Sequence, residues 1–368
     1  MISTSAVRNE ARSSRAIRTL YLEWSPLASP ENYWAPLSYG IDWRNAFLAS
    51  PRLDVMYCDI NRPHHVLVAS MAIDSFDLIV VSHLALGDDV KDIAPWTELL
   101  AKRRGALVSF IGNEYDLMAE KIEFLRDSRA DIVCSQLSLA AAQYLYAELD
   151  QAKIISLPHA LNPDVYQSVT NAKRTTDIGF IGAVYPTWVG DLERTMLLLA
   201  TSEIAPLLGL SHDIRLQNLP RDQWAAFLST TRAIIGAESG SYYLHRKGAL
   251  LTEAKQWCEA NPTAQFDDVE ARFFGDRSGV PSGKTISSRH FEPIGTRTCQ
   301  ILLEGSYAGL LEPNEHYIPV RKDLQDLPEA LRRATDEGIR VAVTNRAYEH
   351  VMSAHTYAHR VDTLVNLL

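Results

Sequence analysis

Short apolar runs alternate with amphipathic stretches along most of this 368-residue chain, and this alternation limits the folds open to it. Residues 76–82, with the sequence FDLIVVS, are almost entirely apolar. A strand that is apolar on both faces is typical of a parallel sheet covered by helices on both sides. We expect the other strands of the first half at residues 17–24, 53–58, 106–111, 131–134 and 153–156, with helices at 43–48, 94–103, 119–126 and 137–149.

The same alternation begins again after residue 176. Between the two series, residues 157–166 (LPHALNPDVY) contain two prolines and lead into a polar stretch, as expected at a junction between domains. We expect strands at residues 177–181, 214–217, 233–236, 300–303 and 316–319, and helices from about 192 and at 221–228, 250–260, 289–295, 327–337 and 345–368.

The chain is long enough for two domains of roughly 150 residues each. We therefore predict an α/β protein with two doubly wound, Rossmann-like domains that face a cleft. Residues 1–168 form the first domain, with a flexible lead-in at 1–16, and residues 169–345 form the second. Residues 346–368 are predicted as a closing helix that crosses back to the first domain.

Composition excludes several classes of protein. The chain has 36 Lys and Arg against 45 Asp and Glu, a formal charge of −9, so we expect no general attraction to nucleic acid or anionic lipid. No apolar run approaches the ~20 residues that span a bilayer. The N-terminus has no apolar signal core, and we expect a cytoplasmic protein without a transmembrane segment. The four cysteines are scattered, and neither they nor the histidines have a metal-ligand spacing, so we predict no metal and no cofactor.

Polar residues follow two of the predicted strands in the first half. His83 follows residues 76–82, while Asn113 and Glu114 follow residues 106–111. Ligands of parallel α/β sheets bind beyond the carboxyl ends of the strands, so His83 and Glu114 are candidate catalytic residues, with Glu114 as a base. A capping or core role for His83 and a helix-start role for Asn113 and Glu114 are the structural alternatives.

Two further candidates follow strands of the second half. Gly182 ends the strand at 177–181, and Glu238 follows the strand at 233–236. Both are candidate donor-binding residues at strand ends. The alternative for Gly182 is a simple strand-end turn, since no G-x-G-x-x-G pattern is present, and the alternative for Glu238 is an ordinary loop carboxylate.

Four motifs in fixed order, preceded by LPHA at residues 157–160, resemble the CgeB-like bacterial glycosyltransferases, which are related to the group 1 transferases and have a GT-B fold. The resemblance is confined mainly to residues 157–368. The motifs are DIGFIG at 177–182, SSRHFE at 287–292 followed by Gly295, HYIP at 316–319, and HTY at 355–357 with Arg360.

The resemblance implies a nucleotide-sugar donor on the second domain and the acceptor on the first. Arg289 offers a guanidinium fork to the diphosphate, and Ser287 and Ser288 precede a predicted helix whose first N–H groups would face the phosphates. Glu292 is similar to the second carboxylate of the group 1 Glu–seven residues–Glu motif, which holds the ribose. Lys284 occupies the position of the first carboxylate, which departs from the family pattern, and we expect it to help neutralise the diphosphate. The alternative for Arg289 and Glu292 is a solvated i,i+3 ion pair.

The expected function is metal-independent transfer of a hexosyl or related sugar from a nucleoside-diphosphate donor to an unidentified glycan, protein or small-molecule acceptor. The rivals are a non-catalytic scaffold of the same fold, which the missing first carboxylate favours, and a sugar-nucleotide epimerase. A transferase acting on nucleobases is a further rival, against which the charge of −9 weighs.

Overall fold

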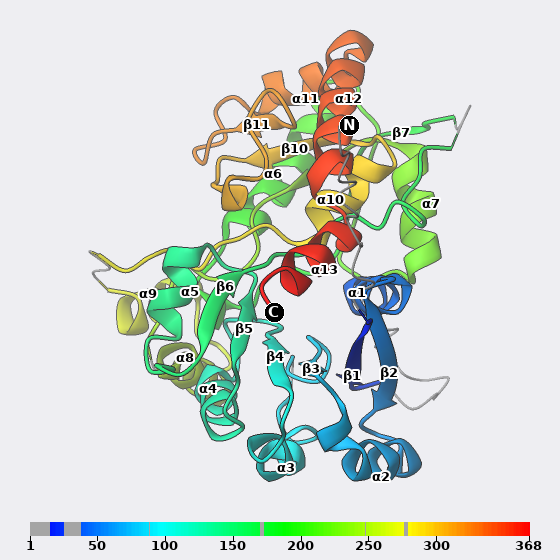
Figure 1. The fold of residues 1–368 in the computed structure, drawn as a ribbon. Helices are drawn as coiled ribbons and strands as arrows, with labels where there is room; N and C mark the ends of the chain where they lie inside the picture. Colours follow the sequence, from blue (N-terminus) through cyan, green and yellow to red (C-terminus); the bar gives the residue numbers. More distant parts are fainter. Residues whose placement is uncertain (1–14, 26–37, 88, 170–172, 247, 276–278) are drawn as a thin grey trace, which may run out of the picture.

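The computed structural model describes residues 15–25, 38–87, 89–169, 173–246, 248–275 and 279–368. Most of the lead-in that we expected at residues 1–16 lies outside these ranges. The described chain forms two parallel β-sheets with helices packed around them, one in each half of the sequence (Figure 1). The predicted pair of Rossmann-like α/β domains is therefore confirmed.

The first sheet has the strand order β2-β1-β3-β4-β5-β6, with every neighbouring pair parallel. All four residues of β3 are fully buried, as its apolar sequence predicts. The elements of this half are β1 (Ile17–Glu23), α1 (Ser38–Ala49), β2 (Leu53–Asp59), α2 (Pro63–Met71), β3 (Leu78–Val81), α3 (Thr97–Ala101), β4 (Ala106–Phe110), α4 (Met118–Asp127), β5 (Ile132–Ser135), α5 (Leu139–Leu145) and β6 (Lys153–Ser156).

The second sheet has the order β11-β10-β9-β7-β8 and is also parallel throughout. Within the described residues, no strand belongs to both sheets. The elements of the second half are β7 (Thr176–Ile181), α6 (Glu193–Leu207), β8 (His212–Arg215), α7 (Arg221–Thr230), β9 (Thr231–Gly236), α8 (Ala249–Ala260), α9 (Phe266–Phe273), α10 (Ser288–Gly295), β10 (Cys299–Leu303), β11 (Ile318–Val320), α11 (Leu327–Thr335), α12 (Glu337–Ala354) and α13 (Tyr357–Val365).

Helices α2 and α9 were not predicted from the sequence. The closing segment also differs from the single helix expected at residues 346–368. The chain leaves helical geometry at His355 and Thr356, where the Thr356 side chain accepts the His359 backbone N–H and caps α13. Capping side chains stabilise a new helix start, and this separates α12 from α13.

After this break, α13 packs on the core of the first sheet. Its Tyr357, Val361 and Leu364 join the core that contains Trp43 of α1 and Phe110 of β4. Arg360 Nε donates to the Pro158 carbonyl oxygen over 3.0 Å. The last helix of the described chain is therefore part of the first domain's core, although it follows the second domain in sequence.

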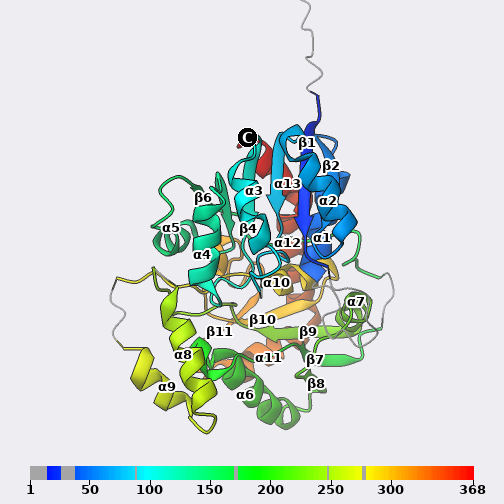
Figure 2. The ribbon, with the colours of Figure 1, turned by 90° about the horizontal axis from the view of Figure 1, so that it is seen from below.

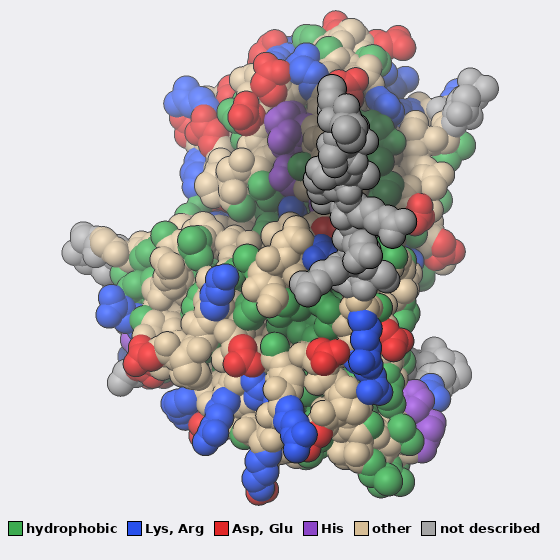
Figure 3. Space-filling view, in the orientation of Figure 1, with side chains coloured by type: hydrophobic (Ala, Val, Ile, Leu, Met, Phe, Trp, Pro, Cys, Tyr) green, Lys and Arg blue, Asp and Glu red, His purple; other side chains and the backbone are tan. Residues whose placement is uncertain are grey.

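The two domains meet along the edge where the first sheet's strands end (Figure 2). Thr285 Oγ1 donates to the Gln136 carbonyl oxygen over 2.7 Å, and Lys255 Nζ lies 2.9 Å from the Asp116 carboxylate. On the other side, Asp42 of α1 pairs with Arg221 of α7. Figure 3 shows acidic and basic side chains interspersed over the face that it presents. No described helix is long and apolar enough to cross a membrane.

Candidate functional site

A pocket of about 140 Å³ lies in the second domain where β7 and β9 end. From β7 the chain passes to β8 on one side, and β9 then lies on the other side of β7, so the winding direction reverses there. The crevice at such a reversal is the usual ligand site of a doubly wound sheet. Residues of β7 and β9 line part of the pocket. The other lining residues include Arg194 of α6, Trp224 of α7, Arg289 and His290 of α10, and Gln300 of β10.

Two arginines line this pocket from different helices. The Arg289 guanidinium stacks on Trp224, 4.3 Å from the ring centroid, and its Nη1 is buried without a hydrogen-bond partner among the described residues. Arg194 donates to the Ala183 carbonyl oxygen over 3.0 Å and stacks on Tyr185 at 4.6 Å. A buried guanidinium N–H without a partner is costly and calls for an anion. The pocket is therefore suited to bind phosphate oxygens.

The N-terminus of α10 completes this cationic side of the pocket. Ser287 caps the helix through a reciprocal pair of bonds with His290, whose Nδ1 accepts the Ser287 N–H over 3.0 Å. His290 Nε2 lies 3.2 Å from the Ala237 carbonyl oxygen. Burial lowers the pKa of His290 to about 4, so its ring is neutral near pH 7. The partial positive charge at this helix start comes from the backbone and not from His290.

Glu292 lies one turn further along α10 and is almost fully buried. Its Oε2 accepts the Trp224 indole N–H over 2.6 Å and lies 4.0 Å from Arg289 Nε. The predicted i,i+3 relationship between Arg289 and Glu292 is present, but Trp224 joins both side chains. The three side chains therefore form one unit, of which Trp224 and Arg289 line the pocket, rather than a solvated ion pair.

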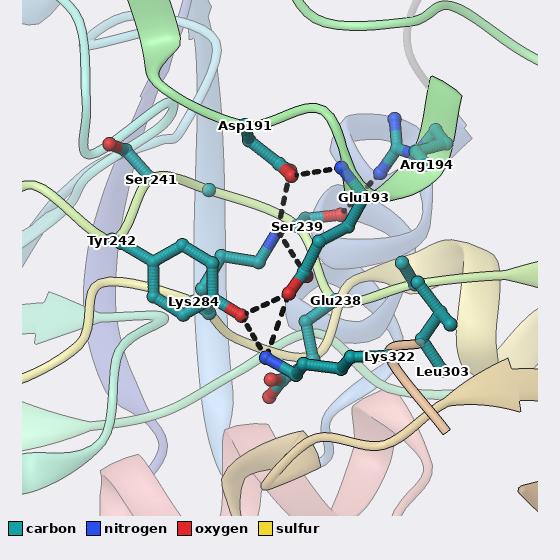
Figure 4. A network of polar contacts seen from close by, with 12 residues as sticks. Asp191, Glu193, Arg194, Glu238, Ser239, Ser241, Tyr242, Lys284, Leu303 and Lys322 are labelled. Atoms are coloured by element: carbon teal, nitrogen blue, oxygen red, sulfur yellow. Dashed lines mark hydrogen bonds and ion pairs between the residues drawn. The ribbon is translucent and has the colours of Figure 1, made fainter. Parts of the chain in front are cut away.

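Lys284 lies in a buried network beside the pocket rather than in its lining (Figure 4). Its Nζ is 2.6 Å from Asp191 and 3.7 Å from Glu193, and both Lys284 and Asp191 side chains are at most 1% exposed. Glu193 Oε1 in turn accepts Tyr242 O–H over 2.7 Å and pairs with Lys322 at the same distance. Two carboxylates thus balance the Lys284 charge within the protein.

Glu238 is buried in the same region, and its Oε1 accepts the Tyr307 backbone N–H over 2.7 Å. Ser306 Oγ donates to the same oxygen over 3.0 Å. These bonds hold the loop after β10 against the end of β9. Ser288 is buried in the first turn of α10 and does not line the pocket.

The two candidate catalytic residues lie in the first domain and are both buried. His83 packs against Trp43 and Phe110, and burial lowers its pKa well below its ordinary value. Glu114 accepts Ser135 O–H and Tyr146 O–H, each over 2.6 Å, and burial raises its pKa. Their surroundings favour structural roles, and the predicted catalytic roles stay predictions.

Three of the seven predicted donor-site residues line the pocket, namely Gly182, Ser287 and Arg289. Arg194, Trp224 and Gln300 were missed. Gln300 carried a signal, since it is a polar residue within the apolar strand CQILL. No group of three or more His, Cys, Asp or Glu side chains is arranged to hold a metal ion within the part of the chain that the structure describes.

Comparison with known proteins finds a family match that includes the part of the site contributed by α10 and β10. Residues 270–366, about a quarter of the chain, match a family model described as glycosyl transferase-like. This segment contains α10, β10, β11 and the helices that close the chain. None of the curated proteins matches the sequence.

Solved structures resemble the whole fold at low sequence identity. Anabaena Alr3699/HepE in complex with UDP and glucose is 11% identical with a TM-score of 0.51, covering 96% of this chain and 100% of that chain. The alpha,alpha-trehalose-phosphate synthase (UDP-forming) from Burkholderia vietnamiensis is 11% identical with a TM-score of 0.50, covering 96% of this chain and 97% of that chain. The chain therefore has the GT-B fold of glycosyltransferases, as the sequence motifs implied.

Proposed function

We propose that this protein transfers a sugar from a nucleoside-diphosphate sugar to an acceptor and that its second domain binds the donor. The observation that carries the proposal is the buried, unpartnered Nη1 of Arg289 in the pocket at the end of β7 and β9. The matching family model and the UDP complex of Alr3699/HepE support it. Within this class, the ordered motifs favour a CgeB-like transferase, and the UDP complex of Alr3699/HepE favours a uridine-diphosphate sugar as its donor.

In the proposed reaction, the bond between the anomeric carbon and the β-phosphate oxygen breaks, and the diphosphate leaves with the electron pair. The acceptor oxygen forms the new glycosidic bond to the anomeric carbon, and its proton passes to solvent. Arg289, Arg194 and the N-terminus of α10 stabilise the negative charge that develops on the leaving group. We propose that these groups act without a metal ion, since Arg194 and Arg289 already supply positive charge to the pocket.

Binding and turnover are tested separately. A thermal-shift screen against UDP-, GDP-, ADP-, CMP- and dTDP-sugars should raise the melting temperature for at least one donor, because a ligand of the native state stabilises it by mass action. Release of nucleoside diphosphate that depends on an added acceptor would then establish transfer. No shift with any nucleotide sugar would contradict the proposal.

The scaffold alternative has a specific observation in its favour, because Lys284 stands where group 1 transferases have a carboxylate and is already neutralised. It predicts nucleotide binding without release of diphosphate from any donor. An epimerase would convert the donor into a second nucleotide sugar without an acceptor. Chromatography of the nucleotide products distinguishes all three.

A further inference from the structure

Gln300 is a buried polar side chain on the floor that the second sheet provides to the pocket. Its register partner on β9 is Ile234, and Ile181 and Leu302 also form this floor. The Gln300 side chain is 1% exposed. Leu or Met would fill the same space in an apolar strand without burying an amide.

The hydrogen bonds of Gln300 fix which of its two amide atoms is available. Nε2 donates to the His290 carbonyl oxygen over 2.9 Å, and only the NH₂ group can make that bond. Oε1 is buried and has no hydrogen-bond partner in the described ranges. Gln300 therefore presents an acceptor to the pocket, and a buried acceptor without a donor is unfavourable.

We infer that Gln300 Oε1 selects the nucleobase of the donor by accepting a hydrogen bond from a ring N–H. This inference rests on the proposed function, because it takes the pocket to be the nucleotide site. Uracil and thymine carry such a donor at N3, and guanine carries one at N1. Cytosine and adenine have a lone pair at the corresponding ring nitrogen, which faces an acceptor unfavourably. Only their exocyclic amino groups could donate to Oε1, and for that the base would have to shift from the position that a ring N–H requires. The ligand class is thus a nucleoside diphosphate whose base contains a ring N–H.

A purely structural role for Gln300 makes a different prediction. The bond to His290 ties β10 to the first turn of α10, which also carries Arg289. If Gln300 only held α10 in place, its loss would weaken every nucleoside diphosphate to a similar extent. A base-selecting residue instead changes the ratio between bases, because a site built to bond an N–H discriminates against a ligand that lacks it.

The test is titration calorimetry of the full chain with UDP, GDP, CDP, ADP and N3-methyl-UDP. N3-methyl-UDP keeps the uracil ring but has no N3–H, so it probes the wild-type protein without any mutation. We expect UDP or GDP to bind at least tenfold more tightly than CDP and ADP, and N3-methyl-UDP to bind at least tenfold more weakly than UDP. In Gln300→Met, UDP should lose this advantage, while CDP affinity changes less than threefold.

The outcomes separate this inference from the proposed function. Equal binding of all five diphosphates, or preference for CDP or ADP, would overturn the role of Gln300 and leave the proposed function intact. Equal losses for every ligand in Gln300→Met would likewise establish the structural role alone. Binding of none of them to the wild-type protein would overturn both proposals. The UDP and GDP arms identify which base the pocket takes.

Discussion

The Trp224 indole N–H donates to the Glu292 carboxylate over 2.6 Å, and the same indole supports the Arg289 guanidinium at 4.3 Å. One aromatic side chain of α7 thus contacts both Arg289, which lines the pocket, and Glu292, which does not. Arg289, which we assign to phosphate, and Glu292, which the resemblance assigns to ribose, are both contacted by Trp224, a residue outside the SSRHFE motif that contains them.

Replacing Arg289 by Ala should weaken UDP more than uridine. The change removes a charge-assisted contact to phosphate worth about 1.5–3 kcal/mol, or roughly 10- to 150-fold in affinity, whereas uridine has no phosphate to lose. Titration calorimetry of both ligands measures the difference. Arg297→Ala is the matched control, because Arg297 also stacks on an aromatic ring, Tyr348 at 4.1 Å, but does not line the pocket. Equal affinities of Arg289→Ala and wild type for UDP would place the donor elsewhere.

Replacing Glu292 by Ala should weaken UDP and uridine by the same factor, since both ligands contain the ribose. Glu292→Gln is the matched control, because the amide oxygen of Gln can still accept the hydrogen bond from the Trp224 N–H. If the carboxylate contacts ribose, the Gln variant should still bind both ligands more weakly than wild type. A loss in the Ala variant that the Gln variant fully restores would mean that Glu292 serves only to hold Trp224.

Lys284→Met should destabilise the fold by about 3–5 kcal/mol, because it leaves the Asp191 carboxylate buried without its cation. Urea unfolding measures this loss. Combining it with Asp191→Leu removes both charges and should recover much of the stability. An unchanged unfolding free energy together with weaker UDP binding would instead support the phosphate-binding role that the sequence predicted for Lys284.

Turnover should survive chelation by EDTA, since the proposed site stabilises the leaving diphosphate with Arg194, Arg289 and the N-terminus of α10. The measurement is acceptor-dependent release of diphosphate before and after dialysis against EDTA. Activity that disappears on chelation and returns with magnesium or manganese would show that a metal ion carries this role.

Glu23 should make stability depend on pH. Burial raises the pKa of Glu23 from 4.5 to about 7, although Arg44 Nη1 lies 2.7 Å from its Oε1. The folded protein then holds this proton more tightly than the unfolded chain, so its contribution to the unfolding free energy falls as pH rises from about 4.5 to 7. The Gln side chain of Glu23→Gln does not titrate. Between pH 5 and pH 8, the unfolding free energy measured with urea should therefore decrease less for this variant than for wild type. Identical decreases in both proteins would contradict this.

The apolar pattern of the sequence determined most of the fold. A run such as residues 78–81 is apolar on both faces, so it can bury its side chains only in a sheet that is covered on both sides. The segments between these runs are long enough for the helices that connect parallel strands. The end of a predicted strand located Gly182 after β7, and the resemblance to the transferase motifs pointed to Ser287 and Arg289 at the start of α10. All three line the pocket. These assignments depend on residues that are neighbours in sequence, which a strand end or a short motif reveals.

The partners of the charged residues were decided by the tertiary structure. Lys284 meets Asp191 across 93 positions, and Trp224 meets Glu292 across 68. Glu114 accepts hydrogen bonds from Ser135 and Tyr146 only because β5 and α5 pack beside the end of β4. The sequence shows that a carboxylate follows a strand, but it does not show whether a distant side chain neutralises it. The energy of a buried charge depends on that distant partner, and packing alone brings the two together.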